Sequence, residues 1–208
     1  MSVSRSRALL LIAGLLSLAS IVTVQPAAAQ NTPTGRASIA IDALNKFETE
    51  TPTTMSAANR TNATAALRQL EQVVAPLKAD AKALATNVRK TGKVAEFDAG
   101  LRAQATKDQI SPALVQMVDR AGGPLAVMEN ADRYINDDLA ARRRVLGLPQ
   151  ASAVRNFLAQ FNPISSAQAG TGCSVVFYIA YGLCRTGGGS CSSFESANNR
   201  HCMGSRKT

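Results

Sequence analysis

The four cysteines of the chain are the side chains whose types and spacing most clearly suggest chemistry. Cys173, Cys184, Cys191 and Cys202 follow the symmetric pattern C-x10-C-x6-C-x10-C. An even number of cysteines behind an export signal, which is described below, is typical of disulfide formation in an oxidising compartment. The pattern therefore predicts two disulfide bonds and no free thiol.

The symmetry also suggests how the cysteines pair. An antiparallel hairpin that turns at Gly187 and Gly188 would place the two inner cysteines side by side, and likewise the two outer ones. Two residues eleven positions apart lie on one face of an α-helix, because eleven residues make about three turns. If both arms of the hairpin are helices, two disulfide bonds could therefore link them, one between the inner cysteines and one between the outer cysteines. A β-hairpin with the same pairs is the alternative, since residues 175–181 are β-branched and aromatic. Sequence alone allows three pairings of four cysteines.

Other chemistry at the cysteines has little support. His201 lies beside Cys202, and it would activate this cysteine as a nucleophile only if the thiol were free. A zinc site is disfavoured because the chain has one histidine and no C-x2-C pair. There is no G-x-S-x-G elbow, no phosphate-binding loop and no H-E-x-x-H motif. We therefore expect no enzymatic activity, no metal and no cofactor.

The first 29 residues have the composition of a signal peptide. Arg5 and Arg7 form a positive start, residues 8–24 are apolar or small, and Pro26 precedes Ala27-Ala28-Ala29. Small residues after an apolar run are the pattern that signal peptidase recognises. An uncleaved membrane anchor is the alternative, although the run is at the short limit for a membrane span. Cleavage after Ala29 predicts a secreted or periplasmic protein.

Residues 30–162 have the apolar periodicity of helices. The longest pattern alternates spacings of four and three, as in a heptad seam. It consists of Ala63, Leu67, Leu70, Val74, Leu77, Ala81, Leu84 and Val88. Pro76 lies within the seam, so the helix is expected to kink or to split there. Because of this proline and the many alanines nearby, packing within one bundle is favoured over pairing with a second chain.

Prolines, glycines and capping residues delimit the other predicted helices. These helices are expected at about residues 38–48, 94–101, 112–121, 124–146 and 152–162. Six or seven helices in this region are enough for one modest core. The predicted fold class is all-α: a helical bundle of six or seven helices, followed by a small disulfide-stapled C-terminal hairpin whose arms are more helix-like than strand-like.

The sequence divides the chain into four parts. Residues 163–172 are rich in small and turn-forming residues, which is typical of a flexible linker. A small-x-small triplet that ends at Ala169 marks a second possible processing site. The predicted parts are a signal peptide (1–29), a helical bundle or pro-region (30–162), the linker (163–172) and a Cys-rich basic module (173–208). The helical region holds no cysteine, so it is expected to fold without the module.

The Cys-rich module combines positive charge with aromatic side chains. The chain has a net charge of +9, and cleavage after Ala29 would leave about +7. The residues that could form an apolar face with a basic rim, against an anionic membrane surface or a protein partner, are Phe177, Tyr178, Tyr181, Phe194, Arg185 and Arg200. The alternative is that the apolar arm is buried on the helical region.

A basic run in the helical region could suggest phosphate binding. Arg142-Arg143-Arg144 lies in the last turn of a predicted helix, where cations complement the negative end of the helix dipole. An acidic pair, Asp137-Asp138, is close by. We therefore expect no nucleic-acid partner.

The order of these parts, with the cysteine-rich sequence GTGCS…LC…C…C, resembles the layout of secreted bacteriocin and toxin precursors. The resemblance covers layout alone and assigns no role to any residue. It implies an exported precursor whose C-terminal peptide is released with antimicrobial or signalling activity. The other hypothesis is an uncleaved, secreted or periplasmic helical adaptor in which the stapled segment caps the bundle. The oligomeric state is open.

Overall fold

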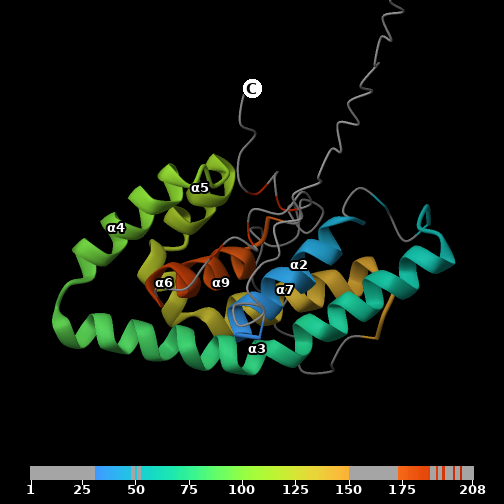
Figure 1. Ribbon diagram of the computed structural model, residues 1–208, viewed down its shortest axis with the longest axis horizontal. Helices are drawn as coiled ribbons and strands as arrows, with labels where there is room; N and C mark the ends of the chain where they lie inside the picture. Colours follow the sequence, from blue (N-terminus) through green and yellow to red (C-terminus); the bar gives the residue numbers. More distant parts are fainter. Residues whose placement is uncertain are drawn as a thin grey trace, which may run out of the picture.

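The computed structural model describes residues 31–47, 50, 53–149, 173–187, 191, 194, 199 and 202. These residues form seven α-helices and no strand, so the all-α class is confirmed. The helices are α2 (Pro33–Asn45), α3 (Ala57–Thr91), α4 (Val94–Lys107), α5 (Pro112–Arg120), α6 (Pro124–Glu129), α7 (Ala131–Val145) and α9 (Val175–Thr186). Helix α3 runs along the length of the molecule (Figure 1). The predicted signal peptide, the linker and the helix expected at residues 152–162 lie outside the described residues.

The long helix α3 contains the predicted apolar seam. The side chain of Ser56 caps its start by accepting a hydrogen bond from the N–H of Asn59 (3.1 Å), and Gly92 ends it with a φ of 69°. Every seam residue is buried or half-buried, and α3 contacts α2, α4, α6, α7 and α9. The seam is therefore filled within one chain. Pro76 does not split the helix, because it lies on the exposed face, where water can bond the carbonyl that loses its donor.

Three helix predictions differ from the structure, and the first is the helix expected at residues 94–101, which continues to Lys107 as α4. Helix α2 begins at Pro33, five residues earlier than expected, because the side chain of Thr32 accepts a hydrogen bond from the N–H of Gly35 (3.0 Å). The helix expected from residue 124 to 146 is divided into α6 and α7 at Asn130. The side-chain amide of Asn130 bonds the carbonyl of Ala126 (2.8 Å), a local bond that competes with a continuing helix.

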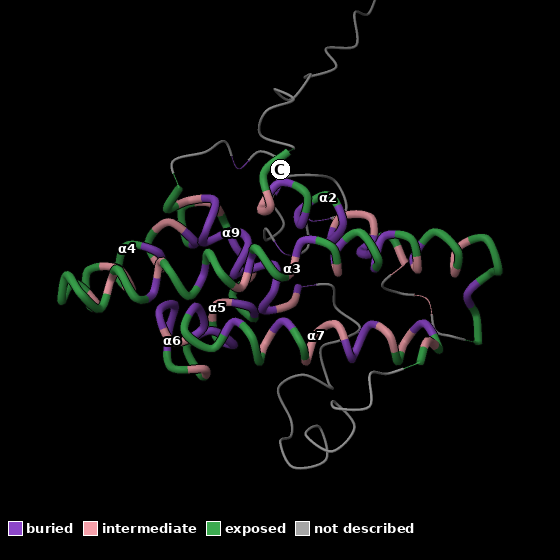
Figure 2. Tube along the Cα trace, turned by 90° about the horizontal axis from the view of Figure 1, so that it is seen from below, coloured by how far each residue is buried: buried purple, intermediate pink, exposed green. Residues whose placement is uncertain are grey.

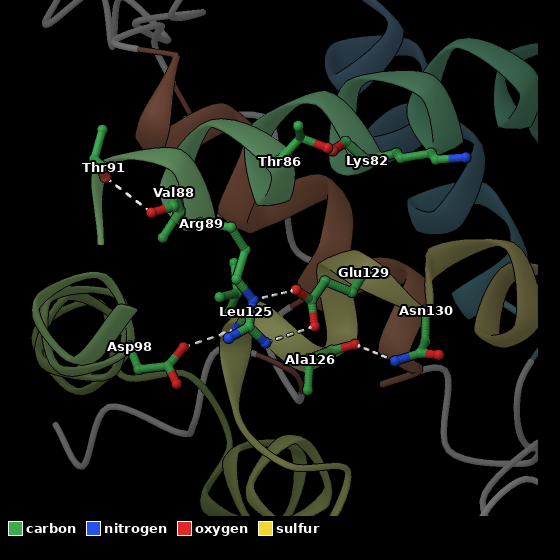
Figure 3. Close-up of polar contacts among 10 residues, drawn as sticks. All are labelled: Lys82, Thr86, Val88, Arg89, Thr91, Asp98, Leu125, Ala126, Glu129 and Asn130. Atoms are coloured by element: carbon green, nitrogen blue, oxygen red, sulfur yellow. Dashed lines mark hydrogen bonds and ion pairs between the residues drawn. The ribbon is translucent and has the colours of Figure 1, made fainter. Parts of the chain in front are cut away.

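Helix α6 is held in place by one arginine and one carboxylate from neighbouring helices (Figure 3). Arg89 of α3 makes two hydrogen bonds to Glu129, Nε to Oε1 at 2.6 Å and Nη2 to Oε2 at 3.1 Å. Asp98 of α4 accepts a hydrogen bond from the N–H of Leu125 at the start of α6 (2.8 Å). These contacts position α6 against α9.

The core is organised around α9. Every residue from Val175 to Cys184 is buried, and α9 contacts α2, α3, α5, α6 and α7 (Figures 1 and 2). A helix that is apolar on all sides is stable only when it is covered on all sides. The β-branched and aromatic run at residues 175–181 is helical and not the alternative strand, and its burial on all sides matches its apolar composition.

Candidate functional site: the disulfide-linked C-terminal segment

Two disulfide bonds close the C-terminal segment, defined here as residues 173–187 together with Cys191, Phe194, Asn199 and Cys202. Cys173 pairs with Cys202 and Cys184 pairs with Cys191, with Cα atoms 5.0 and 5.9 Å apart, as is usual for disulfides. No cysteine is free. This is the nested pairing that the symmetric spacing predicts.

The arms of the predicted hairpin can be compared with the structure only in part. The first arm is helical, as expected, but Cys173 lies before the start of α9 and so does not share a helix face with Cys184. Most of the second arm lies outside the described residues, as do Arg200, His201 and the two predicted processing positions, Ala29 and Ala169.

Neither disulfide connects the segment to the rest of the molecule. All four cysteines of the chain lie within the segment, and each pairs with another of the four. The segment is therefore joined to helices α2–α7 by one covalent path, residues 150–172, and otherwise by non-covalent contacts.

The aromatic side chains of the segment form a buried cluster. Phe177 and Phe194 are edge to face with ring centroids 5.4 Å apart, and Tyr181 and Phe194 are edge to face at 6.1 Å. With Tyr178, all are at most 1% exposed. The four aromatic members of the expected membrane or partner face are therefore buried in this structure. The structure has the alternative arrangement, with the apolar arm buried on the helical region.

Helix α9 is able to approach α4 and α6 closely because residue 182 is glycine. A Cβ atom added to Gly182 would overlap Cε of Met128 and would lie 3.1 Å from Cδ2 of Leu101. A side chain there would require the buried side chains of Met128 and Leu101 to shift.

A charged cluster ties α9 to the end of α4. Asp108 Oδ2 accepts a hydrogen bond from the hydroxyl of Tyr181 (2.7 Å) and lies 2.5 Å from Nη2 of Arg185. Gln104 donates to both carboxylate oxygens of Asp108, at 3.0 and 3.1 Å. The guanidinium of Arg185 also lies 5.6 Å from the ring centroid of Tyr181. These four residues are called the Asp108 cluster below.

Opposing effects set the pKa of Asp108. Burial acts to raise it, but the hydrogen bonds from Tyr181 and Gln104 and the positive charge of Arg185 outweigh burial and hold the pKa below its ordinary value of 3.8. Burial raises the pKa of Tyr181, and the hydrogen bond to Asp108 raises it further. Tyr181 therefore stays protonated and donates, while Asp108 stays ionised and accepts.

Three other polar contacts hold different parts of the segment. They are the hydrogen bonds from the N–H of Ser111 to the carbonyl of Cys202 (2.7 Å), from Nδ2 of Asn45 to Oδ1 of Asn199 (2.8 Å) and from Nη2 of Arg142 to Oγ of Ser174 (3.4 Å). The pair of asparagines is buried. Because the three contacts come from α2, from the start of α5 and from α7, they fix the segment from three directions.

Two of the three arginines at the end of α7 have structural partners. Arg142 is 9% exposed and pairs with Asp138, four residues earlier, at 2.7 Å. Arg143 pairs with Glu71 of α3 at 2.7 Å. Arg144 is exposed. The run therefore links α7 to α3 and to the C-terminal segment, which the dipole argument alone did not indicate.

The Asp108 cluster predicts a pH-dependent part of the stability. A carboxyl group whose pKa is lowered by folding stabilises the folded protein above its unfolded pKa, and this contribution is lost as the pH falls through 3.8 and below. Asp108→Asn should lower the unfolding free energy at pH 7 by about 2 kcal/mol. It should also flatten the loss of stability below about pH 4. Denaturant titrations at several pH values measure both effects.

The control for Asp108 is a carboxylate of the same kind on the surface. Asp132 has a side chain 72% exposed and lies 3.6 Å from Lys78, so Asp132→Asn should change the unfolding free energy by about 0.5 kcal/mol or less. Equal effects of the two substitutions would contradict the importance of the Asp108 cluster.

Comparisons with protein-family models, with curated proteins and with solved structures find no match for the chain. Within the described ranges, no helix is both long enough and apolar enough to cross a membrane. The same residues contain no group of three or more His, Cys, Asp or Glu side chains placed to hold a metal ion.

Proposed function

We propose that the chain is an exported helical interaction protein that acts uncleaved, with its disulfide-linked C-terminal segment as a permanent part of the core. The burial of α9 carries this proposal. Its ten residues from Val175 to Cys184 are all buried, and release of the segment would expose apolar surface on both pieces, at roughly 25 cal/mol for each Å². The arrangement with the segment packed on α2–α7 is therefore the favoured state, which supports a lasting role for the segment in the core.

Export is supported by two features of the chain. The cysteines pair, and disulfides persist in secreted and periplasmic proteins rather than in a reducing cytosol. The first 29 residues have the order of charge, apolar run and small residues that signal peptidase recognises. These two features together support a secreted or periplasmic location after cleavage at Ala29.

A protein partner is favoured over an anionic membrane. The aromatic side chains that would enter a membrane are buried, and Ile39, 42% exposed, is the one large apolar side chain that is exposed among the described residues. Membrane-surface binding requires a contiguous apolar face, whereas a largely polar helical surface suits a soluble partner.

A second candidate is an exported precursor whose C-terminal peptide is released with antimicrobial (bacteriocin-like) or signalling activity. One observation favours it: a peptide cut near Ala169 would keep both disulfides, because both lie within the segment. Such a free peptide would expose its apolar helix, which could then bind an anionic membrane through apolar contact and charge.

Mass spectrometry of the exported protein distinguishes the two candidates. The uncleaved protein predicts one species that begins near Gln30 and ends at Thr208, lighter than the reduced chain by the mass of four hydrogen atoms. Alkylation without reductant should label no cysteine, and alkylation after reduction, the control, should label four. A separate peptide that begins near Gly170 would contradict the uncleaved protein and support the precursor.

A further inference from the structure

Helices α2–α7 surround the C-terminal segment, which is connected to them by residues 150–172. The positions of the two ends of this connection indicate whether the connection or the contacts of the segment hold it in place. The carbonyl of Pro149, before the connection, accepts a hydrogen bond from Arg143 (3.2 Å). The hydroxyl of Ser174, after it, accepts one from the neighbouring Arg142 (3.4 Å). A connection of this length could span roughly 75 Å when extended, yet it leaves and returns at adjacent residues. The contacts of the segment, rather than the connection, therefore set its position.

We propose that α2–α7 form a binding site for a disulfide-closed helical segment, whose occupant is the C-terminal segment of this chain, and that the site keeps its occupant without a covalent link. A chain cut between residues 150 and 172 would then persist as a two-chain complex. The inference goes beyond the proposed function, because it concerns what holds the segment in place and not whether the exported chain is cut.

The site has the features of a groove that binds an apolar helix. Tyr178, Tyr181, Phe177 and Phe194 are the four largest fully buried side chains in the described part of the chain, and all belong to the occupant. Gly182 allows the close approach to α4 and α6. Apolar burial therefore supplies affinity, while the lack of a side chain at Gly182 of the occupant lets α9 approach Leu101 and Met128 closely.

Polar contacts at several points make the site specific for the oxidised segment. Asp108 binds the C-terminal half of α9, and Ser111 and Asn45 bind Cys202 and Asn199 on the second arm. The outer disulfide ties that second arm to the start of α9. Reduction of the outer disulfide would remove this link, so the contacts of the second arm would no longer add to the binding of α9.

The experiment cuts the folded protein and asks whether its two pieces separate. Residues 163–170 are replaced by the recognition sequence of a site-specific protease, and the full-length oxidised protein is cut to completion, as checked by mass under denaturing conditions. At pH 7 the two pieces should co-elute on size exclusion at the volume of the uncut protein. Separate elution at pH 7 would overturn the proposal. If the folded chain resists the protease, cutting in urea and return to buffer lead to the same two outcomes.

Substitution of the Asp108 cluster tests how the occupant is held. In the cut complex, Tyr181→Phe, which keeps the ring and removes the hydroxyl, should speed release of the segment by about tenfold, as for loss of one hydrogen bond to a charged group. Asp132→Asn, the surface control, should leave the release rate unchanged. Equal release rates for the two variants would show that the Asp108 cluster does not help to retain the segment. The mass of the secreted protein reports on processing alone, so failure of the proposed function and failure of this site are distinguishable.

Discussion

A chain that ends at Pro163 is expected to lose its cooperative thermal transition. The helical region has no cysteine, so the sequence predicts that it folds alone, but the position of α9 predicts the opposite. Without residues 173–202, helices α2, α3, α5, α6 and α7 each lose the surface that α9 covers. The remaining apolar contacts would leave helices without fixed packing. Calorimetry and near-ultraviolet circular dichroism of the truncated and full-length proteins measure this.

The control for the truncation is a chain that ends at Cys202. It keeps α9 and both disulfides, so it should melt cooperatively within a few degrees of the full-length protein. A cooperative transition at an unchanged temperature in the chain that ends at Pro163 would show that α9 is dispensable and would restore an autonomous helical region.

Phe177→Asp is expected to prevent folding at pH 7. Phe177 is 0% exposed and packs edge to face on Phe194. Loss of a buried phenylalanine side chain costs about 3–5 kcal/mol, and an unpaired carboxylate in its place costs several more. The total approaches the whole unfolding free energy of an ordinary domain, roughly 5–15 kcal/mol. Circular dichroism and urea titration of the oxidised protein measure the outcome.

Two substitutions serve as controls for Phe177→Asp. Phe177→Leu keeps most of the apolar volume and should cost about 1.5 kcal/mol. Ile39→Asp places the same new charge on an exposed position of α2 and should cost about 1 kcal/mol or less. If Phe177→Asp were as stable as Ile39→Asp, the apolar arm would lie at the surface, as the hypothesis of a membrane-facing peptide requires.

Local patterns predict the elements of this fold well. The apolar seam of α3, its glycine stop at Gly92 and the proline start of α5 are properties of neighbouring residues, so the sequence alone reveals them. The nested cysteine pairing is one of three that the sequence allows, and the symmetric spacing within one short segment suggests it. The ion pair of Asp138 with Arg142 also has a local signal, because residues four apart on a helix are neighbours.

The contacts between distant elements have no such signal. Tyr181 and Asp108 are 73 positions apart, and nothing near Asp108 distinguishes it from an ordinary carboxylate at the end of a helix. The run Val175–Leu183 is apolar on all sides, which indicates burial but does not identify what buries it. The same run therefore fits a membrane-facing peptide and a core helix, and the packing of five helices around it distinguishes them.

The central position of α9 also determines when the protein can finish folding. Chains are synthesised from the N-terminus, at about 5–20 residues per second, so helices α2–α7 are complete before α9 exists. The helix at the middle of the molecule is therefore synthesised after the helices that surround it. Until α9 is synthesised, the apolar surfaces that it covers on α2–α7 stay exposed. A premature stop codon between residues 150 and 175 would leave α2–α7 but remove α9, which is the centre of the protein rather than its edge.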